Sequence, residues 1–165
     1  MTASINRRTF VISTGAIAAA SFAAPALVKA ETTHEVQMLN VHPDNPRQRN
    51  VFAPRILVVQ PGDTVSFVSV NPSHNSASSE GMLPEGAEPW ASQISQGIDV
   101  TLTVPGYYGY QCTPHVGLGM VGLIVVEGEG QANNLETARG VRQRGMASRA
   151  WNEIWEEAEA QGLLG

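Results

Sequence analysis

Between Glu35 and Glu127 the sequence alternates apolar and polar residues with a period of two, which constrains the fold more than any other feature. In the clearest case, Ile98 to Val104, four apolar residues share one face of an extended chain. Similar runs are EVQMLNV, RILVVQ, DTVSFVSV, YYGYQC and VGLIVVE. Proline and glycine, which favour turns, separate several of these runs. Many short strands between turns predict an all-β sandwich or barrel.

The pattern changes after Gly130 to one that is typical of helices. Asn133 followed by Glu136 resembles a capping box. Further on, four apolar residues fall at helical spacing, with glutamates on the opposite face: Trp151, Ile154, Trp155 and Ala158. We expect residues 131–165 to form two short helices, one of which ends near Gly162, packed on a sandwich of residues 31–130.

The first thirty residues have the composition of an export signal. The twin Arg7-Arg8 precedes a weakly apolar, alanine-rich stretch that ends in Val28-Lys29-Ala30, a small-residue cleavage pattern. An uncleaved membrane anchor is the alternative, but the stretch is marginal against the ~20 strongly apolar residues that a span requires. We therefore expect a twin-arginine signal in residues 1–30, cleavage after Ala30, and a periplasmic protein without a membrane anchor.

The charge of the remaining chain excludes several partners. Residues 31–165 contain seven arginines, no lysine and fifteen acidic residues, so the formal charge changes from -5 for the whole chain to -8. An acidic, lysine-free protein is a poor candidate for binding nucleic acid or an anionic membrane. At this length we expect one domain with its own core, and a monomer.

The stretch QCTPHVGLGMVG contains the only cysteine of the chain. Exported proteins usually pair their cysteines, so a single one is often reactive or bound to a metal. Cys112, His115 and Met120 offer a thiolate, an imidazole and a thioether within nine residues, a set that suits copper. A trigonal copper site for electron transfer needs a second histidine. His74 can provide it if the strands before His74 and Cys112 end at the same pole.

Other interpretations of these residues remain open at this point. Copper buffering or delivery would use the same ligands. A hydrolase with Cys112 as nucleophile and His115 or His74 as base would lack an orienting acid and would leave Met120 unused. Structural zinc seldom uses methionine. Four protein ligands would leave no open position on the metal, so we expect no enzymatic activity. The other two histidines, His34 and His42, are expected on the surface.

Five segments resemble, in order, those of the pseudoazurins, which are type 1 (blue) copper proteins of the cupredoxin family: EVQMLN, PGDTVSF, HNSASSEGMLPEGAE, PGYYGYQCTPHVGLGMVGLIVV and NNLETARG. The resemblance covers essentially the whole chain after residue 30. It implies an eight-stranded Greek-key sandwich with two short C-terminal helices and one type 1 copper. It also implies a soluble electron shuttle that serves a nitrite reductase or a c-type cytochrome. The ligands it implies are His74, Cys112, His115 and Met120.

Residues around these ligands are expected to tune the site. Pro114 has no N–H, so one backbone position near the thiolate lacks a donor. Asn75 is then the expected remaining donor, as in the resembled family. An uncharged run beside His115 is the expected electron-exit patch: Val116, Gly117, Leu118 and Gly119.

The sequence departs from the pseudoazurin pattern around the exposed histidine. Val41, Pro72 and Gln111 stand where pseudoazurins generally carry lysines, and Val116 replaces an aromatic residue. Net charge steers the approach of charged partners. An acidic surface without lysine therefore favours either a basic partner or a mainly apolar, salt-insensitive contact.

Overall fold

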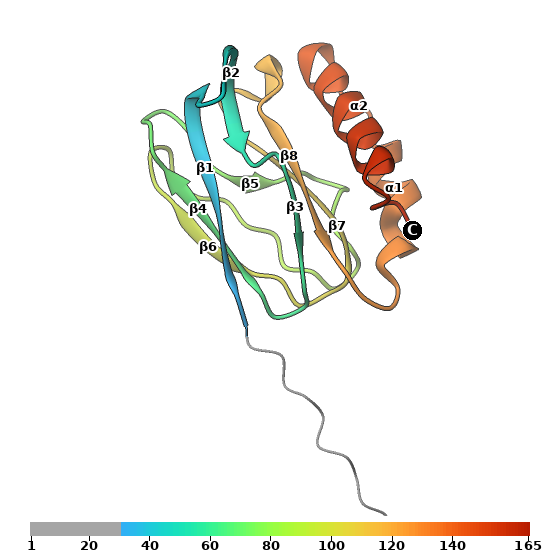
Figure 1. Cartoon of the computed structure of the whole chain (residues 1–165). Coiled ribbons are helices and arrows are strands. Elements are labelled where there is room, and N and C mark those ends of the chain that lie inside the picture. Colours follow the sequence, from blue (N-terminus) through green and yellow to red (C-terminus); the bar gives the residue numbers. More distant parts are fainter. Residues whose placement is uncertain (1–30) are drawn as a thin grey trace, which may run out of the picture.

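Within residues 31–165, eight strands build two sheets that pack face to face, and helices cover the outer side of the second sheet (Figure 1). The structure is a computed structural model that describes residues 31–165. The expected export signal, residues 1–30, lies outside the described residues. The first sheet has the order β2-β1-β4-β6: β1 (Thr33–His42), β2 (Asn45–Ala53), β4 (Thr64–Ser69) and β6 (Ile98–Thr101). The second has the order β3-β8-β7-β5: β3 (Ile56–Val59), β5 (Ala77–Ser78), β7 (Gly106–Gln111) and β8 (Val121–Val126).

The strand pairing mixes parallel and antiparallel neighbours. Strand β1 runs parallel to β4, and β3 runs parallel to β8, while the other pairs are antiparallel. Two strands that are parallel neighbours cannot be joined by a hairpin, so the chain crosses to the other sheet between them. A meander, in which hairpins join successive strands, has no such crossings. The predicted eight-stranded Greek-key sandwich with two short C-terminal helices is confirmed.

Strand β8 is buried along its whole length because both of its faces are covered. Ile124 and Val126 belong to the core between the two sheets, whereas Leu123 and Val125 belong to a second core under the helices. A strand covered on both sides is apolar at every position rather than at alternate ones. This explains the uninterrupted run VGLIVV in the sequence.

The chain after Gly130 forms a 3₁₀ turn, η2 (Gln131–Asn134), and the helices α1 (Leu135–Gly140) and α2 (Gly145–Ala160). The expected apolar stripe of α2 is buried against the second sheet: Trp151, Ile154, Trp155 and Ala158. Helix α2 ends two residues before Gly162, whose φ of 71° is the left-handed conformation that commonly follows a helix. None of the helices within residues 31–165 is long and apolar enough to cross a membrane.

The predicted capping box is wrong. The residue that precedes α1 is Asn134 rather than Asn133, and its side chain makes no capping bond. Instead its Oδ1 accepts from the Tyr107 N–H at 3.0 Å, and its Nδ2 donates to the Tyr107 carbonyl at 2.8 Å. A buried amide finds its partners in the adjacent strand because leaving a backbone group of Tyr107 unpaired would cost more than an uncapped helix end.

The strand pattern was incomplete in three places. Strand β2 was not expected because most of its residues are polar and exposed, and it lies at the sheet edge. The two-residue strand β5 was too short to produce a period. The run from Ile98 ends as a strand at Thr101, although Leu102 is still buried and its N–H donates to the Asp63 carbonyl.

Both histidines that were expected on the surface are partly buried. His34 Nε2 lies 3.0 Å from the Asp63 carboxylate, and the His34 side chain is only 27% exposed. His42 is half-buried at the end of β1, where its Nδ1 accepts from the Asp44 N–H at 3.1 Å. The His34 ring thus links β1 to the turn before β4, and the His42 ring links the end of β1 to the residues that follow it.

Candidate metal centre

Three potential ligand atoms meet at the end of the sandwich where the loops after β4 and β7 come together. His74 Nδ1 and His115 Nδ1 are 3.1 Å apart. The Cys112 sulfur lies 3.3 Å from His115 Nδ1 and 3.7 Å from His74 Nδ1. All three atoms lie within 4.8 Å of one another, so two imidazoles and one thiolate can bind a single ion.

His74 is fully buried and is oriented by Asn40 at the end of β1. Its Nε2 lies 2.8 Å from Asn40 Oδ1, an oxygen that can only accept a hydrogen bond. The proton of the neutral imidazole therefore sits on Nε2, and Nδ1 keeps its lone pair for a metal. Asn40 was not singled out from the sequence, although it ends the segment EVQMLN, because its partner His74 is 34 residues away along the chain.

The loop from Cys112 to Met120 closes on itself through its backbone. The Cys112 N–H donates to the Met120 carbonyl at 3.0 Å, and the Met120 N–H donates to the His115 carbonyl at 3.2 Å. Between them lies a 3₁₀ turn, η1 (Val116–Leu118), which ends at Gly119 with a φ of 87°. Met120 is 1% exposed and shares the core between the sheets with Cys112. The loop thus holds its sulfur and nitrogen groups in a fixed relation.

Asn75 joins the two loops that carry the histidines. Its Oδ1 accepts from the Thr113 N–H at 2.8 Å, and its Nδ2 donates to the Thr113 hydroxyl at 3.1 Å. The backbone N–H groups of Asn75 and His115 lower the pKa of the Cys112 thiol, and the His115 N–H also donates to the Cys112 carbonyl at 3.0 Å. The sequence pointed to Asn75 but not to the His115 donor, and Pro114, which is exposed, contributes none.

Burial favours the neutral forms of two candidate ligands, Cys112 and His74. It raises the pKa of the Cys112 thiol, against the opposing effect of the Asn75 and His115 N–H groups. Burial also lowers the pKa of His74, and the charge of nearby His115 lowers it further. A neutral imidazole is ready to bind a metal, whereas the thiol must release its proton when a metal binds.

His115 is half-exposed and is the candidate ligand nearest to solvent, since His74 and Cys112 are buried. Of the expected electron-exit patch, Gly117 and Leu118 lie at the surface, and the Leu118 side chain is 49% exposed. Val116 instead packs into the core under the helices. The exposed apolar area beside His115 is therefore smaller than the sequence suggested.

Comparisons with known proteins agree with this geometry. The family model "Copper binding proteins, plastocyanin/azurin family" matches residues 39–127. The pseudoazurin of Paracoccus pantotrophus is 42% identical over 125 residues, which are 75% of this chain and 82% of that protein. The pseudoazurin of Methylorubrum extorquens is 32% identical over 146 residues, or 87% of this chain and 95% of that protein.

Solved structures give the same result. The pseudoazurin structure from Sinorhizobium meliloti is 44% identical, with a TM-score of 0.72, and the match covers 78% of this chain and 97% of that one. The refined crystal structure of pseudoazurin from Methylobacterium extorquens AM1 is 31% identical, with a TM-score of 0.69, and covers 76% of this chain and 98% of that one.

A Greek-key sandwich with a His-Cys-His cluster between two of its loops defines a cupredoxin. The chain belongs to the plastocyanin/azurin family of copper-binding proteins, among the pseudoazurins. Proteins of this kind are blue copper electron carriers and not enzymes. Copper is the cofactor of the family, and a set of two nitrogens and soft sulfur fits it.

Proposed function

We propose that this chain is a soluble periplasmic shuttle that carries single electrons between respiratory redox proteins. The observation that supports this most strongly is the cluster of His74, Cys112 and His115, whose ligand atoms lie within 4.8 Å of one another at the edge of a rigid sandwich. Copper, when bound, supplies the one-electron couple. The protein supplies the position, the exclusion of water and the contact with partners.

The proposed ligand set is His74, Cys112 and His115 in the trigonal plane, with Met120 as the weak axial ligand. Buried Met120 offers the only thioether in the closed loop that begins at Cys112. Hydrogen bonds between the His74 and Cys112 loops, through Asn75, hold the ligands in place as the metal changes oxidation state. With all four positions filled by protein, electrons pass without a bound substrate.

Half-exposed His115, with Gly117 and Leu118 beside it, is the proposed point of electron entry and exit. A nitrite reductase or a c-type cytochrome is the proposed partner, and the chain acts as a monomer. Residues 1–30 are the proposed twin-arginine export signal, so the N-terminus of the protein recovered from a periplasmic fraction should be Glu31.

Cyclic voltammetry of the copper-loaded protein tests the shuttle directly. A reversible one-electron wave, with copper retained through repeated cycles, is the expected result. Copper that is lost on reduction, or an irreversible wave, would instead support buffering or delivery. Cys112→Ser, which replaces the soft thiolate with a hydroxyl, should abolish the reversible wave.

A further inference from the structure

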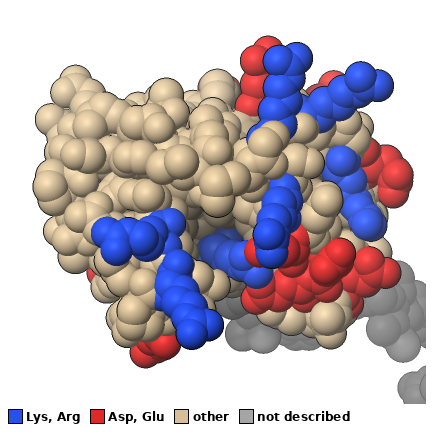
Figure 2. Space-filling model, turned by 90° about the horizontal axis from the view of Figure 1, so that it is seen from above, with Lys and Arg blue, Asp and Glu red and all other residues tan. Residues whose placement is uncertain are grey.

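The arginines of this acidic protein are gathered at the copper end. Four of the seven that follow residue 30 line one cleft of about 570 Å³ between β2 and α2: Arg47, Arg49, Arg55 and Arg149. Figure 2 looks onto this end of the molecule and shows basic side chains around a hollow. Residues 31–165 carry a formal charge of -8, so this cleft is rich in basic residues although the protein as a whole is acidic.

The same cleft adjoins the proposed electron port. Leu118, Gly119 and Met120, from the loop that carries His115, form part of its wall, and Met146 lines it from the first turn of α2. The side chains of Leu118 and Met146 are 49% and 58% exposed. A partner that reached His115 over this apolar rim would also cover the cleft.

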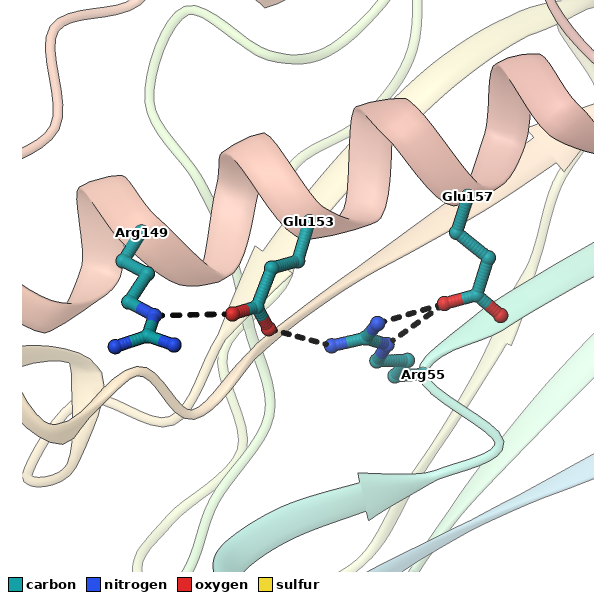
Figure 3. A network of polar contacts seen from close by, with 4 residues as sticks. All are labelled: Arg55, Arg149, Glu153 and Glu157. Atoms are coloured by element: carbon teal, nitrogen blue, oxygen red, sulfur yellow. Dashed lines mark hydrogen bonds and ion pairs between the residues drawn. The ribbon is translucent and has the colours of Figure 1, made fainter.

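Two of the arginines are held in place by glutamates of α2 (Figure 3). Arg55 donates to Glu157 at 2.7 and 3.0 Å and lies 3.5 Å from Glu153. Arg149 donates to the other oxygen of Glu153 at 3.1 Å. These pairs fix the guanidinium groups and neutralise two of the four positive charges.

The other two arginines are available to a ligand. Arg47 and Arg49 are exposed and form no ion pair with any residue of the range 31–165. They are two residues apart on β2, so their side chains leave the strand on the same face. Guanidinium groups side by side can each bind a carboxylate through two hydrogen bonds.

We propose that the cleft binds an acidic segment of the redox partner, with carboxylates on Arg47 and Arg49 and apolar partner surface on Leu118 and Met146. The proposal rests on the proposed electron-shuttle function. Net charge alone favours a basic partner or an apolar contact, but the placement of the arginines favours an acidic one. A positive end on an acidic protein turns the copper end toward an acidic partner as the two approach.

A hexaglutamate peptide serves as the probe, titrated at low salt into the isotope-labelled Cu(I) protein and followed by NMR. The expected result is a saturable shift of backbone amides in β2, in η1 and in the first turns of α2. Arg47→Gln with Arg49→Gln should weaken binding about tenfold, as expected for the loss of two exposed ion pairs. Arg142→Gln with Arg144→Gln is the matched control, because both residues are exposed and lie outside the cleft.

Equal loss of affinity in both double variants would overturn the proposal, because binding would then reflect net charge alone. Amide shifts confined to another face, or unchanged affinity after Arg47→Gln with Arg49→Gln, would overturn it as well. The voltammetry of the double variant separates this proposal from the function on which it rests. If the wave is reversible but peptide binding does not depend on Arg47 and Arg49, only the proposed docking site is contradicted. If the wave of the unaltered protein is irreversible, the proposed shuttle function is contradicted.

Discussion

Gly122 shows how a single missing side chain shapes the core beside the metal centre. It pairs with Tyr110 across β7 and β8, and a Cβ added at Gly122 would overlap the Tyr110 ring. That ring packs edge-on against Phe52 and Phe67, at centroid distances of 4.8 and 5.0 Å. The Tyr110 side chain is fully buried, and this burial raises the pKa of its hydroxyl well above its ordinary value.

We therefore expect Gly122→Ala to lower the free energy of unfolding by about 2 kcal/mol, because the aromatic cluster must shift to admit a methyl group. Urea unfolding of the metal-free protein, followed by tryptophan fluorescence, measures this. Gly117→Ala is the matched control, since a Cβ there meets no atom within 4 Å. Equal stability of the two variants would show that the core is looser than the structure indicates.

Asn40 is the residue that we expect to matter most for copper affinity among those that do not touch the metal. Asn40→Ala removes the acceptor that keeps the His74 proton on Nε2, so copper affinity should fall about 10- to 100-fold. Competition with a chelator measures the affinity. Asn40→Asp keeps an acceptor at the same place and should restore binding. Equal copper affinities for Asn40→Ala and Asn40→Asp would show that Asn40 does not orient the His74 ring.

At the scale of elements, Asp63 binds three residues from two parts of the sandwich. Its carboxylate accepts from the N–H groups of Thr32, at 3.0 Å, and Gln60, at 2.9 Å, and it contacts the His34 ring. The Gln60 backbone N–H, then His34 and then the Thr32 N–H lower the Asp63 pKa from 3.8 to about 2. The carboxylate thus connects the start of β1 to the turn between β3 and β4.

Because the pKa of Asp63 is lower in the folded state, its stabilising effect is complete above pH 4 and is lost as the pH falls toward 2. Asp63→Asn should be less stable than the unaltered protein at neutral pH, and this difference should narrow at pH 2.5. Unfolding free energies at the two pH values measure it. Asp99→Asn, at an exposed position of β6, is the matched control for the loss of one carboxylate. If the difference in unfolding free energy between Asp63→Asn and the unaltered protein were the same at both pH values, the pKa of Asp63 would not be lowered in the folded state.

The sequence predicted those elements whose burial leaves a periodic pattern. Strands β4 and β6 alternate because one face of each is covered, and α2 repeats at helical spacing for the same reason. Strand β2 has few buried side chains, so its formation depends on backbone pairing with β1, which leaves no pattern in the sequence. The sequence assigned the helix cap to Asn133, because the partner of Asn134, Tyr107, is 27 residues away and leaves no local signal.

Much of the metal centre could be inferred because its residues are chemically unusual. A single cysteine followed closely by histidine and methionine suggests a metal wherever the loop lies. The contributions of Asn40 and of the His115 N–H could not be inferred, because they depend on how loops from separate strands meet. The arginine cleft was hidden for the same reason: composition gives the net charge but not its distribution.

At the scale of the whole molecule, that distribution should govern how fast small redox reagents react. Oxidation of the Cu(I) protein by anionic hexacyanoferrate(III) should slow as the ionic strength rises from about 0.01 M to 0.1 M, because salt screens the attraction of the basic end. The rate with cationic tris(phenanthroline)cobalt(III) should not fall. Stopped-flow absorption measures both rates. If the hexacyanoferrate(III) rate instead rose with ionic strength and the cobalt(III) rate fell, the net negative charge of the protein would dominate at the copper end.

The visible absorption spectrum of the Cu(II)-loaded protein tests the central claim, that His74, Cys112, His115 and Met120 bind copper as a type 1 centre. We predict an intense blue or green charge-transfer absorption, which arises because the Cys112 thiolate bonds directly to copper. Cys112→Ser should abolish it. A pale solution with only weak absorption, like that of copper bound by nitrogen and oxygen ligands, would contradict the assignment.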